Sequence, residues 1–186
     1  YNLRAKLDFH VTVVAPLTIS LLGPFRVTLD GAPLSDFKYN KARALLAYLA
    51  MEREVLHPRA ALCALFWPEL PDRAARRNLT QVVRALREAL DNGARASGPL
   101  VATPEAVHLD PERAVDVDAL NCTTWLDEAD RHTHRSWRTC AACEDRLRAA
   151  VTLYRGEFLS QFFVADSAPF EEWARLWRER LRQRVM

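Results

Sequence analysis

Alternating hydrophobic and polar residues mark the first element of the chain. Odd-numbered positions from 17 to 29 are apolar, except at Gly23-Pro24, where a bulge or bend would explain the interruption. Asp30-Gly31 follows, a dipeptide typical of tight hairpin turns, and Ala32-Pro33-Leu34 would begin the return strand. Residues 17–36 therefore predict a small antiparallel β unit.

The hydrophobic period then changes from two to 3.6 residues, which is typical of amphipathic helices. The segment KARALLAYLAMER has its leucines on one face, and Asn40 before it is a candidate N-cap. A second helix, RAALCALFW, has Pro58 just inside its start and ends before Pro68. Two short helices are therefore expected after the β unit.

A third and longer helix is expected over 71–91. Pro71 and Asp72 open it, and Asn92-Gly93 stops it. Residues 98–109 alternate weakly around a turn at Thr103-Pro104-Glu105, which predicts a β-hairpin. A β unit, three helices and a hairpin, with short connections, form the element order of a winged helix-turn-helix.

The rest of the chain has a helical pattern. Residues 110–120 are expected to form a connector, and helices are expected at 116–131, 138–155 and 169–185. Residues 156–168 are expected to be a loop with several large apolar side chains. The aromatic residues between Tyr154 and Trp177 fit the core of a helical repeat better than a ligand pocket. The last helix ends the chain with an apolar stripe and no following partner, which favours a fragment of a longer protein.

The helix at 71–91 segregates apolar and basic residues. At about 100° per residue, an apolar stripe centred on Leu79 faces the core. Between residues 71 and 90, only Asp72 and Glu88 are acidic. The opposite side of the helix contains Arg73, Arg77, Thr80, Gln81 and Arg84, flanked by Arg76, Asn78 and Arg87.

These side-chain types suit DNA. Arginine, asparagine and glutamine forks match base edges in the major groove, and arginine also binds phosphate. The N-terminal part of a recognition helix reaches the bases, so DNA binding is the leading hypothesis and a solvated charged face is the alternative. Lys41 and Arg43 in the first helix suit phosphate contacts or simply solubility. The hairpin tip has an acid and no base, which disfavours groove contact by a wing.

Four runs of sequence resemble a known family. LTISLLGPFRVTLDGAPL, KARALLAYLA and LFWPELPDRAARRNLTQVVRALREAL are similar to the DNA-binding domain of SARP/AfsR-type bacterial transcriptional regulators, an OmpR/PhoB-like winged helix. RLRAAVTLYRGEFLSQFFVADSAPFEEWARLWRERL resembles the start of the bacterial transcriptional activation domain that follows it. Together they cover about residues 17–186. The hairpin departs from the family, because EAVHLDP stands where a Gly-Tyr-containing strand is common.

The resemblance implies an α+β, mostly α chain. An N-terminal extension would span 1–16, a winged-helix DNA-binding domain 17–112, and the start of a TPR-like helical activation domain 113–186. The protein would be a sequence-specific transcriptional activator whose partners are double-stranded DNA with direct repeats, RNA polymerase, and further copies of itself head to tail on DNA. The groove-facing candidates that it implies are Arg77, Asn78, Gln81 and Arg84, with Arg87 as a phosphate contact.

Composition narrows the picture further. The net charge is only +2, so local clustering rather than overall charge has to support DNA binding. Four cysteines are too few for a small disulfide scaffold, and free thiols are expected. The first residues lack a signal-peptide pattern, and no run approaches the roughly 18 apolar residues of a membrane span. A cytoplasmic protein without membrane contact is expected.

Histidines and cysteines cluster at 132–143. His132, His134, Cys140 and Cys143 include a Cys-x2-Cys half-site of the kind that binds zinc. The His-x-His spacing is unusual, since it puts two imidazoles on different sides of a helix. Structural zinc, a redox pair and half-buried thiols stay open, and the last, with no metal and no cofactor, is favoured.

Enzyme signatures are missing from the sequence. It has no GxxxxGK[ST], GxGxxG, HExxH or GxSxG motif. Asp116 and Asp118 could form a carboxylate pair, but VDVDAL fits a helix entry with Asp as cap better. An enzyme is not expected. The alternative to a DNA-binding regulator is a protein-interaction module, with the winged helix as a docking scaffold.

Overall fold

A computed structural model describes residues 17–91, 98–133 and 140–186. The expected β unit is confirmed as strands β1 (Leu17–Ser20), β2 (Arg26–Leu29) and β3 (Ala32–Pro33). β1 and β2 pair antiparallel with Leu17 opposite Leu29. Asp30 and Gly31 have φ angles of 50° and 80°, which are the left-handed values that a tight hairpin turn requires.

A fourth strand corrects the expected connector at 110–120. β7 (Val115–Val117) pairs parallel with β1, so the sheet order is β3-β2-β1-β7. The expected boundary between the two domains at residue 112 thus precedes a strand that belongs to the first sheet. The two parts of the chain are joined by backbone hydrogen bonding as well as by packing.

Three helices follow the β unit, as predicted: α1 (Asn40–Met51), α2 (Arg59–Phe66) and α3 (Asp72–Leu90). The prediction that Asn40 caps α1 is wrong. Tyr39 is the N-cap residue, and the Asn40 amide instead donates to the Phe163 carbonyl oxygen at 2.8 Å, which ties α1 to the 156–167 loop. The expected stop of α3 at Asn92-Gly93 lies outside the described residues.

The predicted hairpin is present as β5 (Leu100–Ala102) and β6 (Ala106–Leu109). A third strand, β4 (His57–Pro58), pairs with β6 and gives the order β4-β6-β5. The start of α2 is therefore hydrogen-bonded to the wing.

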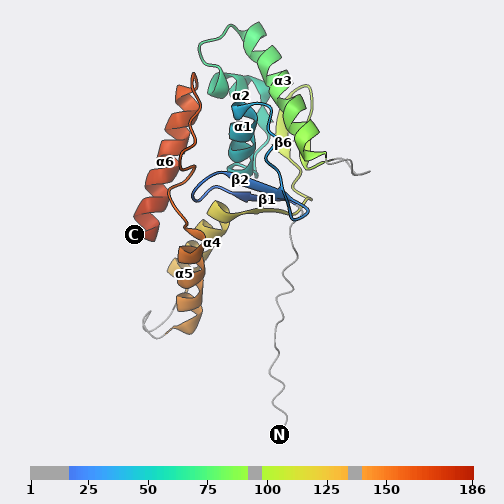
Figure 1. The fold of residues 1–186 in the computed structure, drawn as a ribbon. Coiled ribbons are helices and arrows are strands. Elements are labelled where there is room, and N and C mark those ends of the chain that lie inside the picture. The colour runs from blue at the N-terminus through green and yellow to red at the C-terminus, as the bar shows by residue number, and fades with distance from the viewer. Residues whose placement is uncertain (1–16, 92–97, 134–139) are drawn as a thin grey trace.

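Three helices form the rest of the chain: α4 (Asp118–Arg131), α5 (Ala141–Leu153) and α6 (Ala168–Val185). Figure 1 shows α4 and α5 side by side below the sheet, whereas α6 runs along α1 and α2 on the side away from α3. No helix within the described ranges has the length and apolar character needed to cross a membrane.

One hydrophobic core joins the two parts. The cluster of buried residues runs without a break from β1 through the three helices to α6. The aromatic rings of α6 supply much of this contact, because Phe170 packs 5.4 Å from Phe66, and Trp173 packs 5.1 Å from Tyr48. The helical segment, residues 118–186, therefore packs into the same core as the winged helix.

Asp118 also joins the two parts of the chain, through hydrogen bonds. The prediction that an aspartate caps α4 is wrong, because Val117 is the N-cap residue and no side chain caps the helix. The Asp118 carboxylate instead accepts the backbone amides of Leu21 at 2.7 Å and Leu22 at 3.2 Å, and pairs with Arg155 at 2.8 Å. The bend at residues 21–24 also accepts the Leu159 amide at the Leu21 oxygen, at 2.7 Å. Burial raises the pKa of Asp118, and the amides and Arg155 oppose that rise.

Candidate nucleic-acid interface

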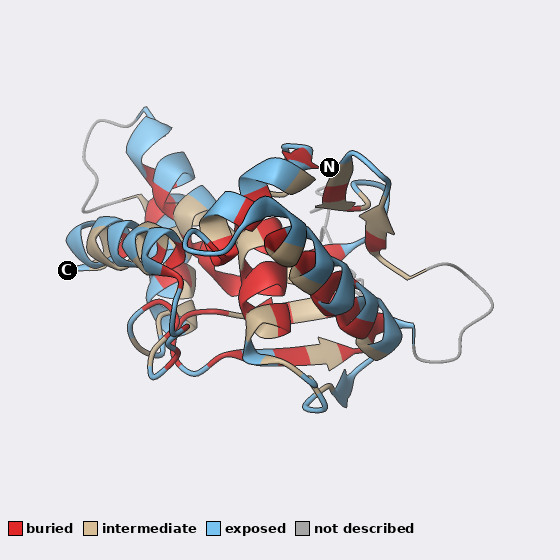
Figure 2. Ribbon diagram, turned by 90° about the horizontal axis from the view of Figure 1, so that it is seen from above, coloured by how far each residue is buried: buried red, intermediate tan, exposed pale blue. Residues whose placement is uncertain are grey.

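The apolar and basic residues of α3 lie on opposite faces, as the helical period predicts. The apolar stripe is buried, whereas the opposite side is exposed along the length of the helix (Figure 2). Side chains that hold a helix in place by burial leave the other face rigidly presented to a partner. The exposed residues are Arg73, Arg76, Arg77, Thr80, Gln81, Arg84 and Arg87, and Asn78 is half-buried among them.

Among the described residues, four arginines of this face make no ion pair. Within the described part of the chain, no carboxylate lies within 4.0 Å of the guanidinium nitrogens of Arg73, Arg76, Arg77 or Arg87. A solvated helix that is stabilised by its own charges typically pairs them at i,i+4. The shortage of such pairs leaves a net positive surface, which favours an anionic partner over simple solvation.

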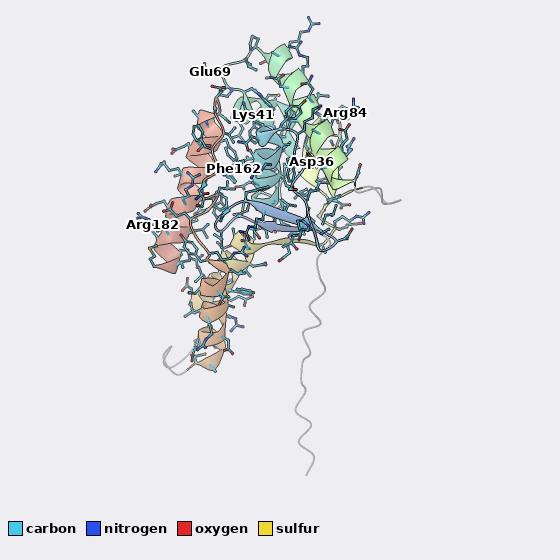
Figure 3. All side chains as sticks on the ribbon, viewed as in Figure 1. Asp36, Lys41, Glu69, Arg84, Phe162 and Arg182 are labelled. Carbon is cyan, nitrogen blue, oxygen red and sulfur yellow. The ribbon has the colours of Figure 1, made fainter. Side chains whose placement is uncertain are left out.

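Arg84 is the exception on this face. Its Nε donates to Glu88 Oε1 at 2.7 Å, and the bond and charge of Glu88 raise the pKa of Arg84. The two side chains are 81% and 61% exposed, so a phosphate or base could displace the carboxylate at little cost. Figure 3 shows Arg84 on the side of α3 away from Lys41 and Phe162. The Thr80 hydroxyl donates to the Arg76 carbonyl oxygen at 2.8 Å, so it could act toward a partner only as an acceptor.

Lys41 lies beside the middle of α3. Its Nζ donates to the Phe66 carbonyl oxygen at 2.6 Å and lies 4.9 Å from the centre of the Trp67 ring. Burial lowers the pKa of Lys41. Together with Asn78 and Gln81 it lines a surface pocket of about 580 Å³. The structure thus brings Lys41 to two of the predicted α3 residues, although its ammonium group already has a partner.

Arg43 is placed differently. Its guanidinium lies 5.0 Å from the ring centre of Phe25 and 5.1 Å from that of Phe162, at the junction with the helical segment. The Arg43 side chain thus extends from α1 over the ring of Phe25, next to β2, and over that of Phe162 in the 156–167 loop. A phosphate contact by Arg43 stays a prediction.

Arg59 is a basic residue that sequence reasoning missed. The Arg59 Nε donates to the Thr103 carbonyl oxygen at 2.8 Å, and the Arg59 backbone amide donates to the Glu105 carbonyl oxygen at 2.9 Å. The wing tip, which has no base of its own, therefore holds a guanidinium beside it. The two-residue strand β4 creates this contact, and a strand so short gives no periodic signal in the sequence.

The paired carboxylates at 116 and 118 do not face a common site. Asp118 is held by the buried bend at 21–24, and Asp116 accepts from the Asn121 amide at 2.6 Å. Each therefore has a structural partner of its own, and the two do not form an acid–base pair.

The histidine–cysteine cluster is brought together in part. His132 Nδ1 lies 3.0 Å from Cys143 Sγ and 3.4 Å from Cys140 Sγ, while His134 lies outside the described residues. Backbone hydrogen bonds from the start of α5 lower the pKa of Cys140, and burial raises that of Cys143. The other two cysteines, Cys63 and Cys122, are buried free thiols as expected.

The fold has a counterpart among solved structures. Mycobacterium tuberculosis EmbR, in complex with a low-affinity phosphopeptide, resembles this chain with a TM-score of 0.67 and 26% sequence identity. That likeness supports a SARP-like fold. The match covers 91% of this chain and 44% of the EmbR chain, so this chain spans less than half the length of its counterpart. Neither a protein-family model nor a curated protein sequence matches the chain. The architecture of this chain, a winged helix followed by a helical segment, is the one expected from its sequence.

Proposed function

We propose that this chain is the DNA-binding part of a transcriptional regulator of the SARP type, with α3 in the major groove. The observation that supports this most strongly is the exposed row of arginines on α3, four of which lack an acidic partner within 4.0 Å among the described residues. In a winged helix this face is the one that meets base edges. The likeness to EmbR supports a transcription regulator of the SARP type.

The residues would divide their roles by position. Arg77, Gln81 and Arg84 project from the second to fourth turns of α3, where forked side chains would reach base edges. Arg73, Arg76 and Arg87 would contact phosphates, which set affinity and register but read no sequence. Asn78 is half-buried beside Lys41, so its contact with a base would come from the edge of the interface.

The place of α6 suits a duplex on α3. α6 covers the opposite side of α1 and α2, so the helical segment leaves the basic face open (Figure 1). Tandem copies on direct repeats and recruitment of RNA polymerase by the helical part belong to the same proposal. They rest on the family resemblance and require a DNA-bound assembly to test.

Two alanine substitutions test the assignment. Arg77→Ala and Arg84→Ala should each weaken binding to a selected duplex by about 1–3 kcal/mol, as expected for a base-reading arginine. Arg148→Ala in α5 is the matched control, since Arg148 is exposed and pairs with Glu144 at 2.7 Å in a four-residue spacing like that of Arg84 and Glu88. Fluorescence anisotropy at fixed salt gives the affinities. Unchanged binding in both α3 variants would show that α3 is not the recognition helix.

The second candidate is a protein-docking module. It is favoured by the exposed Leu147 and Val151 on α5 and by the acidic wing tip. This reading predicts that substitutions on α5 impair function and that the α3 variants do not.

A further inference from the structure

Three donor atoms converge between the end of α4 and the start of α5. His132 follows the last residue of α4, Cys140 precedes the first residue of α5, and Cys143 lies in its first turn. His132 Nδ1 is 3.0 Å from Cys143 Sγ and 3.4 Å from Cys140 Sγ, and all three donor atoms lie within 4.8 Å of one another.

These separations are close to those around a tetrahedral metal. Zinc binds sulfur at about 2.3 Å and imidazole nitrogen at about 2.0–2.1 Å, so tetrahedral ligands lie about 3.5 Å apart for nitrogen–sulfur and about 3.8 Å for sulfur–sulfur. The two nitrogen–sulfur distances, 3.0 and 3.4 Å, are within about 0.5 Å of that value, and the two sulfur atoms lie within 4.8 Å of each other. We propose that His132, Cys140 and Cys143 bind one Zn²⁺ ion.

The donor set selects the metal. Two thiolates and one imidazole suit zinc, whereas calcium and magnesium require oxygen ligands. Two thiolates also balance the charge of a divalent ion. Cys-x2-Cys is a zinc half-site, and here it spans the first turn of α5, where the backbone amides of Ala142 and Cys143 hydrogen-bond to the Cys140 sulfur. The fourth coordination position would take water or another donor.

The ion would close the far end of the α4–α5 pair. α4 is tied at its other end to the bend at 21–24 through Asp118, and α5 leads through Arg155 to the same anchor. A metal at His132 would therefore fix the pair at both ends. The function of such a site is structural, and it is independent of whether α3 binds DNA.

A disulfide between Cys140 and Cys143 is the competing use of the same sulfur atoms. It would need only the two thiols and would not involve the His132 ring. Zinc uses all three residues, so His132→Ala separates the two cases: it removes a metal ligand but leaves a disulfide intact.

The test uses the whole chain, purified under reducing conditions without added metal. Elemental analysis should find about one zinc per chain in the parent, and under about a fifth of an equivalent in Cys143→Ser and in His132→Ala. Cys63→Ala is the control, because Cys63 is a free thiol in α2, and it should keep its zinc. Replacement of zinc by Co²⁺ should give the intense visible bands of tetrahedral thiolate coordination. Because His132 is exposed, His132→Ala should fold normally and tests the site even if a cysteine variant folds poorly.

Three results would overturn the proposal. The first is a reduced parent protein that holds under about a fifth of an equivalent of zinc and shows no cobalt bands. The second is zinc that stays at the parent level in both ligand variants. The third is a freshly purified protein whose mass shows the loss of two hydrogens at Cys140 and Cys143.

Discussion

Replacing Asp118 by alanine tests whether the winged helix and the helical segment unfold as one unit. The Asp118 side chain is 7% exposed, and it accepts the amides of Leu21 and Leu22, both of which are buried. Asp118→Ala leaves these two amides without an acceptor. Each unsatisfied buried donor costs about 1–3 kcal/mol, and release of a buried carboxylate offsets part of that, so a net loss of about 3 kcal/mol is expected.

Two control variants calibrate this loss. Asp116→Ala removes one hydrogen bond to Asn121 from the same strand–helix junction and should cost about 1 kcal/mol or less. Arg155→Ala removes a guanidinium that is 52% exposed, and its loss should also be about 1 kcal/mol or less. The difference between Asp118→Ala and these controls isolates the effect of the buried amides.

Urea unfolding followed by tryptophan fluorescence measures all three variants. Because one buried cluster spans both parts, the parent should show a single transition, and Asp118→Ala should shift its midpoint without splitting it. A loss no larger than that of Asp116→Ala would refute the anchor. Two separate transitions in the parent would refute the shared core.

The difference in free energy of unfolding between the parent and Asp118→Ala should depend on pH with a defined sign. Burial raises the pKa of Asp118 in the folded state above its ordinary value of 3.8. A raised folded pKa means that the folded state binds the proton more tightly, so the stability from this group is fully present at low pH and falls as pH rises through the folded pKa. The gap between the parent and Asp118→Ala should therefore be larger at about pH 4 than at about pH 7.

Three further substitutions probe the junction and the basic face. Glu52→Ala removes the carboxylate oxygen that accepts from the indole nitrogens of Trp173 at 3.0 Å and Trp177 at 3.4 Å. It should lower the free energy of unfolding by about 1–3 kcal/mol and shift tryptophan emission. Glu54→Ala, at an exposed position, should do neither. Gly23→Ala forces a side chain onto a φ of 107° and should cost about 1–3 kcal/mol by urea unfolding; no loss would mean that the bend relaxes. Glu88→Gln frees Arg84 and should tighten duplex binding at low salt while leaving the unfolding midpoint unchanged, and weaker binding would contradict a role for Arg84.

Periodic elements could be predicted from the sequence because their signals are local. The stripe centred on Leu79 buries its residues as the helical period requires, and Asp30-Gly31 adopts the turn that its residues favour. The expected fold class follows from the order of such elements, and the likeness to EmbR agrees with it.

Contacts between distant segments could not be predicted in the same way. β4 and β7 have two and three residues, too few for a period, and their partners lie far along the chain. Asn40 and Asp118 stand where capping residues stand, yet their side chains satisfy backbone groups of the 156–167 loop and the 21–24 bend. Arg59 reaches the wing tip only because β4 pairs with β6.

Selection of duplexes from a random pool, at about 150 mM salt where purely phosphate-driven binding is weak, tests the central claim most directly. Sequence readout by α3 predicts an enriched motif, repeated about one helical turn apart if copies bind head to tail, and loss of that enrichment in Arg77→Ala but not in Arg148→Ala. A pool without an enriched motif, together with binding that disappears as salt is added, would contradict the claim and leave the arginines of α3 as an electrostatic surface.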